Sequence, residues 1–568
     1  MYHSEEVRRL APEMDPLRLG MGWKLEDLEK PKVIIESTFG DSHPGSAHLL
    51  KFVDTAAAGV AAAGGRAARY FTTDICDGMA QGHDGINYSL ASRDMIANMV
   101  EIHNNATPFD AGVFIASCDK GLPGLLMGIG RTDLPAVVVT GGVMEAGPDL
   151  LTLEQIGAYS AMCQRGEISE AQLTYYKHHA CPSCGACSFM GTAGTMQVMC
   201  EALGLTLPGS ALLPATSADL VEVARKAGAQ AVELAKRGLT ARDIVTRESF
   251  ENAIIVHAAI SGSTNAILHL PAIAHEFGIE IDADTFERIH KSAHYLLDVR
   301  PAGRWPSEYV YYAGGVPAIM EEVRHLLHLD VMTVTGKTLG ENLDGGYYEK
   351  CAEYLKKTGV KKEDIIRPFD APIGDKGTIA ILRGNLAPEG AVVKHSAVPV
   401  EMHKALLRAR PFDCEEDAIA AVIAHDIKPG DAVFIRYEGP KGSGMPEMFY
   451  TTEAISSDPE LGKTIALITD GRFSGASKGP AIGHVSPEAA EGGPIALVEE
   501  GDLIQIDIPA RVLAIVGVRG ERKTPEEMDG ILKERRAAWQ PRPLRYQSGV
   551  LKIYSEHAVG PMKGGYMK

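Results

Sequence analysis

The stretch Ala111-Gly-Val-Phe-Ile-Ala-Ser117, followed at once by Cys118-Asp-Lys-Gly-Leu-Pro-Gly124, decides the fold. A run with hardly a polar side chain predicts a strand that is covered on both faces, as in a parallel sheet. Residues 32–37 and 136–140 form similar runs, and helical patterns separate the three. Strands that alternate with helices indicate a parallel α/β sheet, whose ligands gather beyond the carboxyl ends of the strands. The loop that begins at Cys118 therefore lies where a ligand is expected.

A second loop also has a cysteine followed directly by an aspartate, that is, a soft sulfur ligand followed by a hard oxygen ligand. Cys76 and Asp77 open the Gly-rich segment Cys76-Asp-Gly-Met-Ala-Gln-Gly-His-Asp-Gly85, just as Cys118 precedes Asp119. Thiolates favour iron–sulfur clusters or zinc, whereas carboxylates favour magnesium or manganese. Two such pairs at predicted strand ends indicate two unlike metals side by side.

A cysteine-rich loop lies farther along the chain. Cys181, Cys184 and Cys187 fall within Ala180-Cys-Pro-Ser-Cys-Gly-Ala-Cys187, which runs into an apolar helical pattern. Several thiolates beside a helix N-terminus make a soft-metal site. Zinc is the weaker choice, because a second pair of ligands at the usual spacing is missing from this loop.

Composition limits the size, the partners and the location. The chain has 568 residues, which exceeds the size of a single core, so two domains are expected. Its formal net charge of −18 and its lack of strongly basic runs exclude a nucleic-acid partner. No run reaches the roughly 18 apolar residues of a membrane span, and no secretory signal pattern opens the sequence. The chain has nine cysteines, an odd number, and several of them are clustered. This pattern indicates free thiols in a reducing compartment rather than a framework of disulfides. We expect a cytoplasmic protein without a membrane partner.

The pattern changes near residue 376. From there, short β-rich segments alternate with turns of Gly, Pro and Asp, which predicts a mostly-β, barrel-like domain. We therefore expect a parallel-sheet α/β domain over residues 1–375 and a barrel-like domain over residues 376–568.

Three polar loops are further candidates for a site. Ser261-Gly-Ser-Thr-Asn265 either positions a polar ligand or caps a helix. Glu447 ends one loop of the β-rich part, and Ser474 lies between Phe and Gly in another. Taken by its local pattern, Ser474 is either a nucleophile or a turn residue, because no His/Asp partners stand at a nucleophile-elbow spacing.

Ordered motifs resemble the dihydroxy-acid and sugar-acid dehydratase family, which includes the phosphogluconate and xylonate dehydratases. The resemblance extends from about residue 32 to the C-terminus. It implies an N-terminal α/β domain joined to a β-barrel-like domain, in a homodimer or a dimer of dimers. The motifs that carry it are Cys-Asp-Gly at 76–78, Cys-Asp-Lys at 118–120, Gly-Ala-Cys at 185–187, Thr-Gly-Lys-Thr-Leu-Gly-Glu-Asn-Leu at 335–343, Gly-Met-Pro-Glu at 444–447 and Thr-Asp-Gly-Arg-Phe-Ser-Gly at 469–475.

The resemblance also implies roles for individual residues. Cys118 and Cys187 would hold an iron–sulfur cluster, and Ser474 would be the base that takes the C2 proton of a 2,3-dihydroxy acid. The cluster and magnesium would act as Lewis acids on the hydroxyl and carboxyl groups of that substrate. The implied magnesium ligands are Asp77, Asp119, Glu447 and Lys120, the last as a carbamate.

One departure from the family pattern concerns the third thiolate. Many members carry a cluster cysteine in a Pro-Cys-Asn segment, where this chain has Pro44-Gly45-Ser46. Cys76 is our choice instead, because Cys76-Asp77 then copies Cys118-Asp119, and Cys184 is the alternative. The cluster type, [2Fe-2S] or [4Fe-4S], stays open.

The motifs divide on the substrate. Those around residues 76, 118 and 191–195 resemble aldonate dehydratases, so we expect a sugar acid such as xylonate, arabinonate or gluconate, converted to a 2-keto-3-deoxy acid in carbohydrate metabolism. Phe473 and the Gly-Pro-Lys-Gly segment at 439–442 favour the alternative, the dihydroxy-acid dehydratase of branched-chain amino-acid biosynthesis. A more distant alternative is a non-catalytic iron–sulfur redox sensor. Such a sensor would need the cysteines but not the acids together with Ser474.

Overall fold

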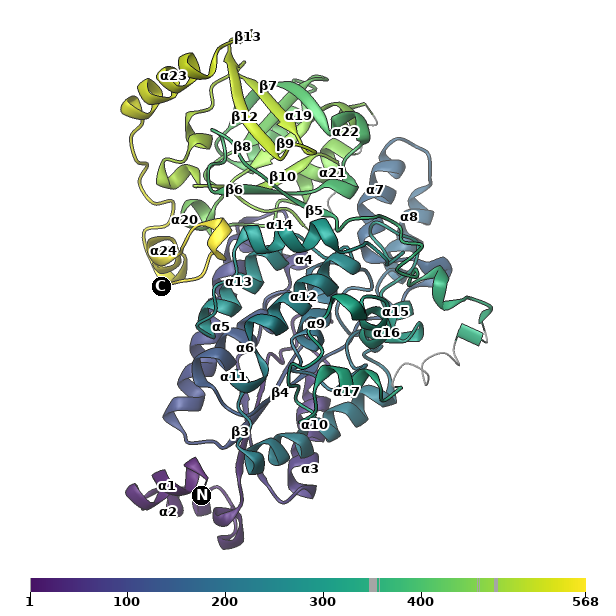
Figure 1. Cartoon of the computed structure of the whole chain (residues 1–568), viewed down its shortest axis with the longest axis vertical. Coiled ribbons are helices and arrows are strands. Elements are labelled where there is room, and N and C mark those ends of the chain that lie inside the picture. Colours follow the sequence, from purple (N-terminus) through teal and green to yellow (C-terminus); the bar gives the residue numbers. More distant parts are fainter. Residues whose placement is uncertain (1, 347–354, 357, 457, 459, 475–478) are drawn as a thin grey trace.

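A parallel sheet organises the first half of the chain (Figure 1). The computed structural model describes residues 2–346, 355–356, 358–456, 458, 460–474 and 479–568. Within them the first sheet has four strands in the order β2-β1-β3-β4, and every neighbouring pair is parallel. All residues of β1, β3 and β4 are buried, which confirms the predicted strands and explains their apolar runs. The strands are β1 (Lys32–Ser37), β2 (Arg66–Phe71), β3 (Ala111–Ala116) and β4 (Ala136–Thr140).

Helices surround this sheet at close range. Helices α3 (Leu49–Ala62) and α10 (Ala218–Arg237) pack against each other. Gly59 and Gly228 lie at their crossing, where a Cβ on either residue would overlap the backbone of the facing helix. None of the helices in the described part of the chain has both the length and the apolar character that crossing a bilayer requires.

The second half contains a larger, curled sheet (Figure 1). Among the described residues it has nine strands in the order β13-β12-β11-β7-β8-β9-β10-β6-β5. A bridge between Arg383, just after β5, and Val512 in β12 brings the two ends toward each other, as in a half-barrel. The strands are β5 (Ile379–Leu382), β6 (Gly390–Lys394), β7 (Lys404–Phe412), β8 (Asp431–Ile435), β9 (Ala466–Thr469), β10 (Ala481–Ser486), β11 (Leu503–Asp507), β12 (Val512–Val518) and β13 (Glu521–Arg522).

The two sheets confirm the expected fold class, a parallel α/β part followed by a mostly-β, barrel-like part. Strands β7 to β10 pair in parallel, whereas the outer strands pair antiparallel. The predicted domain boundary between residues 375 and 376 falls just before β5 and stays a prediction.

The C-terminus returns to the first half and is held there by a buried arginine. Arg93, in α5 (Tyr88–Ala106), is fully buried and forms an ion pair of 2.9 Å with Asp94. Its guanidinium also donates to the carbonyl oxygens of Gly564 and Gly565, at 3.0 and 3.1 Å. The backbone N–H of Met567 donates to Asp94 at 2.8 Å. These bonds tie the end of the second half to a helix of the first.

We predict that Arg93→Met destabilises the whole protein. The substitution leaves the Asp94 carboxylate buried without its partner cation, a change that costs about 3–5 kcal/mol. The shift is measured as the change in the free energy of unfolding by urea, and Lys552→Met is the matched control. Lys552 is half-buried, with 40% of its side chain exposed, and lies 3.7 Å from Glu556, so its loss should cost less than about 1 kcal/mol. Equal effects of the two substitutions would contradict this account of the C-terminal tie.

Candidate active site

Two loops at the carboxyl edge of the first sheet carry the predicted ligands. Asp77 opens α4 (Asp77–Ala80), which follows β2, and Asp119 lies between β3 and α6 (Gly121–Thr132). The strands β2 and β3 flank β1, so their parallel ends bring both loops to one edge. The sequence therefore located these two loops correctly as neighbours.

A third carboxylate reaches this point from the second half. Glu447 lies between α20 (Pro440–Ser443) and α21 (Tyr450–Ser456). One oxygen each of Asp77, Asp119 and Glu447 lie within 4.8 Å of one another. Three converging carboxylates can hold a hard divalent cation such as Mg²⁺. The two halves of the chain thus build one acidic group, which we call the acidic triad.

Two buried cations stabilise the acidic triad. Lys120 Nζ lies 2.7 Å from Asp77 and 4.0 Å from Asp119. Arg472 lies 2.8 Å from Glu447 and 3.6 Å from Asp77, and both cationic side chains are fully buried. The sequence motifs contained Arg472 but gave no sign of its role, because its partners come from distant segments.

Burial and these cations act in opposite directions on the carboxyl groups. Burial raises the pKa of Asp119 and of Glu447, because the charged form loses its water. Burial also opposes the ionisation of Asp77, but Lys120 and Arg472 outweigh it and lower its pKa. The triad is thus held together by charge compensation.

Polar side chains around the triad fix its orientation. The Ser89 hydroxyl donates to Asp77 at 2.7 Å and accepts from Arg472 at 3.0 Å. Asn265 donates from Nδ2 both to Glu447 and to the Thr192 hydroxyl. The 261–265 loop therefore contacts the acidic triad through Asn265, which also precedes helix α13 (Ala266–Glu276), so both of its sequence interpretations stay predictions.

Thiols and carboxylates line a single cavity of about 360 Å³. Its walls include three cysteines, and Ser474 lies on the same cavity. Burial raises the pKa of the Cys118 thiol, and the nearby Asp74 and Asp119, followed by Cys76 and Cys187, raise this pKa further. The cavity therefore brings sulfur donors, which favour soft metals, beside the carboxylate oxygens of the acidic triad, which favour hard metals. The cysteines are Cys76, Cys118 and Cys187.

The other two cysteines of the Cys-rich loop are placed differently. Cys181 is exposed, and the groups that act on the ionisation of Cys184 are Lys51 and Glu145 rather than the acids of the triad. At the position of the family's Pro-Cys-Asn cysteine, Gly45 packs directly against Cys118 Sγ, so that a Cβ there would overlap the sulfur.

The lining of the cavity beyond the triad and the thiols is mostly apolar, and its polar residues include Glu154, Ser160 and Lys177. Helix α7 (Ile156–Gln164) and the residues before it form one side, and Phe449 and Tyr450 lie on the opposite half of the chain. This wall meets whatever part of a ligand extends beyond the donors. Its apolar residues are Ile75, Leu153, Ile156, Phe189 and Phe449.

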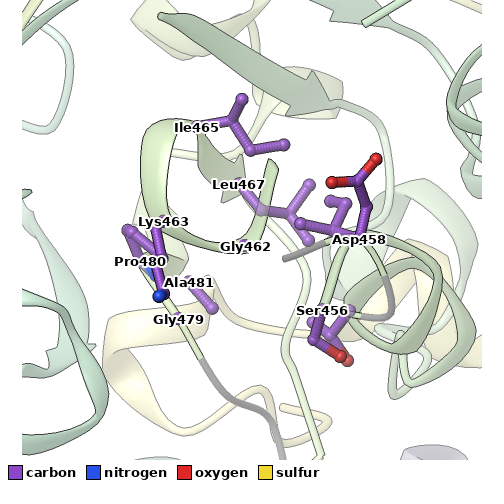
Figure 2. Close-up of a pocket in the computed structure, with 11 residues that line it drawn as sticks. Ser456, Asp458, Gly462, Lys463, Ile465, Leu467, Gly479, Pro480 and Ala481 are labelled. Carbon is purple, nitrogen blue, oxygen red and sulfur yellow. The ribbon is translucent and has the colours of Figure 1, made fainter. Parts of the chain in front are cut away.

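A second pocket, of about 160 Å³, lies beside the segment 479–481 (Figure 2). Ile465 and Leu467 line its apolar part, and Asp458 and Lys463 stand on opposite sides. It contains neither the acidic triad nor the thiols, so it is not part of the candidate site.

Comparison with known proteins identifies the same family in both halves. Residues 30–342 match the family model described as dihydroxy-acid/6-phosphogluconate dehydratase N-terminal, and residues 364–565 match its C-terminal counterpart. The chain is 45% identical to dihydroxy-acid dehydratase 1 of Methanosarcina acetivorans, over 95% of each chain. It is 44% identical to the dihydroxy-acid dehydratase of Methanosarcina barkeri over 99% of each, and 43% identical to that of Caldanaerobacter subterraneus subsp. tengcongensis over 97% of this chain and 96% of the relative.

These relatives correct the expected substrate. The prediction of a sugar acid is wrong, because full-length relatives at this identity carry the name dihydroxy-acid dehydratase. The motifs behind that prediction contain or adjoin the thiols and carboxylates of the cavity. The lining beyond them is mostly apolar, and a hydroxyl group placed against its apolar residues would lose hydrogen bonds with water. Phe473 and the 439–442 segment, which favoured the branched-chain alternative, agree with these relatives.

We predict that Glu447→Gln weakens binding of Mn²⁺, a spectroscopic stand-in for Mg²⁺, to the protein before cluster loading. The affinity should fall at least about tenfold, since even the loss of an outer-shell partner has an effect of that size. Electron paramagnetic resonance of free Mn²⁺ measures it. Asp84→Asn is the control, because Asp84 is an exposed acid on the same loop as Asp77. Unchanged Mn²⁺ binding in Glu447→Gln would rule out the triad as a metal site.

Proposed function

Because the chain belongs to the dihydroxy-acid/6-phosphogluconate dehydratase family, we propose that it is a dihydroxy-acid dehydratase. The family makes it a hydro-lyase, an enzyme that removes water from its substrate. The proposed substrate is a 2,3-dihydroxy acid with a short branched alkyl tail, and the product is the corresponding 2-oxo acid. The redox-sensor alternative is set aside, since it has no need of a dehydratase framework. The observation that carries the choice of substrate is the apolar wall of the cavity.

The wall favours an alkyl tail on energetic grounds. Each buried CH₂ or CH₃ group of a branched tail gains about 0.8 kcal/mol by leaving water. Each hydroxyl of an aldonate that enters the same wall without a partner loses about 1–3 kcal/mol. Ile156 and Phe189 offer such a hydroxyl no side-chain partner, so only a hydroxyl that reaches Glu154, Ser160 or Lys177 avoids this cost. Two or three hydroxyls therefore outweigh any gain, and the branched acid is preferred.

The proposed cofactors are Mg²⁺ and an iron–sulfur cluster. The acidic triad fits the first, since it offers only oxygen donors, and the thiols of the cavity fit the second. Lys120 stands 2.7 Å from Asp77, so a carbamate on its Nζ would add oxygen donors to the triad. When bound, these groups supply Lewis acids that withdraw electrons from the oxygens of the substrate.

The residues of the chain orient the substrate and move its proton. Ser474 lies on the cavity, and we propose that its Oγ takes the proton from C2. The positive charge of Arg472 favours the deprotonated serine. Loss of the C2 proton and of the C3 hydroxyl leaves an enol, which becomes the 2-oxo acid.

For the third cluster ligand we propose Cys76 rather than Cys184. Cys76 shares the cavity and acts on the ionisation of both Cys118 and Cys187. Cys184 does neither. Whether the cluster is [2Fe-2S] or [4Fe-4S] is left open. A homodimer or dimer of dimers and a cytoplasmic location remain predictions.

We predict a strong preference between substrates. The enzyme, loaded anaerobically with iron, sulfide and Mg²⁺, should have a kcat/KM for 2,3-dihydroxyisovalerate at least about 100-fold above that for xylonate, arabinonate or gluconate, since two unpartnered hydroxyls cost about 3 kcal/mol. A coupled assay of 2-oxo acid formation measures it. The variant Ile156→Asn, which adds a polar partner to the wall, should narrow the ratio. Equal or faster turnover of an aldonate would refute the proposed substrate.

We predict that Cys76→Ser and Cys184→Ser differ in cluster content. After anaerobic reconstitution, Cys76→Ser should lose most bound iron and sulfide, because a thiolate ligand is missing. Cys184→Ser should keep both, and it is the matched control, since the two variants lose the same atom. Iron and sulfide assays with visible absorption spectra distinguish them. The reverse pattern would make Cys184 the ligand.

A further inference from the structure

Two buried histidines that have no part in the mechanism described above contact each other. His257 lies in α12 (Arg247–Ala259) and His290 in α14 (Ala283–Ser292). These helices pack against each other, and α14 also packs against β5 of the second half (Figure 1). No more than 1% of either residue is exposed, and Nδ1 of His257 lies 3.2 Å from Nε2 of His290. One of the two rings therefore donates a hydrogen bond to the other.

The outer nitrogens of the two rings decide which ring donates. The backbone nitrogen of Ile379, in β5, lies 3.3 Å from Nδ1 of His290 and can only donate, so this Nδ1 accepts. The carbonyl oxygen of Ser263 lies 2.9 Å from Nε2 of His257 and can only accept, so this Nε2 carries a proton. A neutral imidazole has one N–H and one lone pair, so Nε2 of His290 donates to Nδ1 of His257. We call the series Ile379, His290, His257 and Ser263 the histidine chain.

Burial keeps both rings in this neutral form and in one orientation. It lowers the pKa of His257 to about 4 and also lowers the pKa of His290, because an imidazolium would lose its water. Two glycines allow the backbone to approach the rings closely. A Cβ on Gly262 would lie 2.4 Å from Cδ2 of His257. A Cβ on Gly377 would lie 2.4 Å from Nδ1 of His290. Packing and hydrogen bonding therefore both fix the rings.

The Ser263 end of the histidine chain reaches the acidic triad through Asn265. The backbone N–H of Asn265 donates to the Ser263 hydroxyl at 3.2 Å, and the same hydroxyl lies 3.0 Å from that of Thr192. Nδ2 of Asn265 donates to the Thr192 hydroxyl at 2.8 Å and also to Glu447. Both N–H bonds of this amide are thus used. The position of Ser263 therefore determines where Asn265 meets Glu447.

We propose that His257 and His290 are positioning residues of the metal site. By holding the Ser263 carbonyl, they fix the point at which Asn265 donates to Glu447. The inference rests on the proposed function, because it takes the acidic triad to be the Mg²⁺ site. A partner that binds a ligating carboxylate from outside orients its other oxygen toward the metal. The histidine chain begins at β5 in the second half, which also supplies Glu447, and ends in the first half. It therefore fixes the loop of Ser263 relative to the half that carries Glu447.

The test measures Mn²⁺ affinity in variants of the full chain, loaded anaerobically with iron and sulfide and freed of Mg²⁺. Electron paramagnetic resonance of free Mn²⁺ gives the affinity. His257→Leu removes both hydrogen bonds of the ring, and the affinity should fall at least about fivefold, since loss of an outer-shell partner itself costs about 10–100-fold. His290→Leu breaks the chain at a second point and should have a similar effect. His257→Gln keeps a donor and an acceptor, so its affinity should stay within about twofold of the wild-type value.

A second measurement separates positioning from a loss of stability. Because the histidines act through Asn265, adding His257→Leu to Asn265→Ala should lower the affinity by less than about twofold beyond Asn265→Ala alone. Leu234→Ala is the control. Leu234 is a fully buried apolar residue of α10, and its truncation destabilises the core without removing a side-chain hydrogen bond. This variant should have a lower free energy of unfolding by urea and an unchanged Mn²⁺ affinity.

The outcomes distinguish this inference from the proposed function. A wild type that binds Mn²⁺, with unchanged affinity in both His257→Leu and His290→Leu, overturns the positioning role alone. An equal loss of affinity in Leu234→Ala, or a further loss when His257→Leu is added to Asn265→Ala, shows that the histidines only stabilise the fold and also overturns that role alone. A wild type that binds no Mn²⁺ overturns the acidic triad as a metal site, and with it both the inference and the proposed function.

Discussion

Mutual repulsion among Asp77, Asp119 and Glu447 is the constraint on which the rest of the structure depends. Three carboxylates within 4.8 Å of one another are stable only with positive charge between them, and Lys120 and Arg472 supply it. Two of the acids come from the first sheet, whereas the third comes with Arg472 from the second half. The site therefore exists only where the two halves meet, and the C-terminal tie at Arg93 helps to hold them there.

The cavity has two ends with different chemistry. At one end thiols and carboxylates stand together, and this end suits the carboxylate and hydroxyl groups that every member of the family must bind. At the other end Ile156 and Phe189 present an apolar surface, where the proposed substrate would place its alkyl tail. In this proposal the thiols and carboxylates determine the reaction type, whereas Ile156 and Phe189 determine the choice of substrate.

The sequence predicted what depends on local patterns. Strands β1, β3 and β4 were evident because both faces are buried, and the donor loops followed from the ends of those strands. The parallel pairing of β7 to β10 was missed, since short β-rich segments look alike in either orientation. Arg472 was missed because its partners, Asp77 and Glu447, come from distant segments. The sugar-acid prediction failed for the same reason: the apolar wall is scattered along the chain and forms no motif.

The central claim is that a soft and a hard metal site share one cavity. It is tested most directly by an anaerobic crystal structure of the iron-loaded enzyme with Mn²⁺ in place of Mg²⁺, recorded at the iron and manganese absorption edges. The account predicts iron peaks bonded to the sulfurs of Cys76, Cys118 and Cys187, and a manganese peak among the oxygens of Asp77, Asp119 and Glu447. Iron bound at Cys181 and Cys184, with no manganese at the acids, would contradict it.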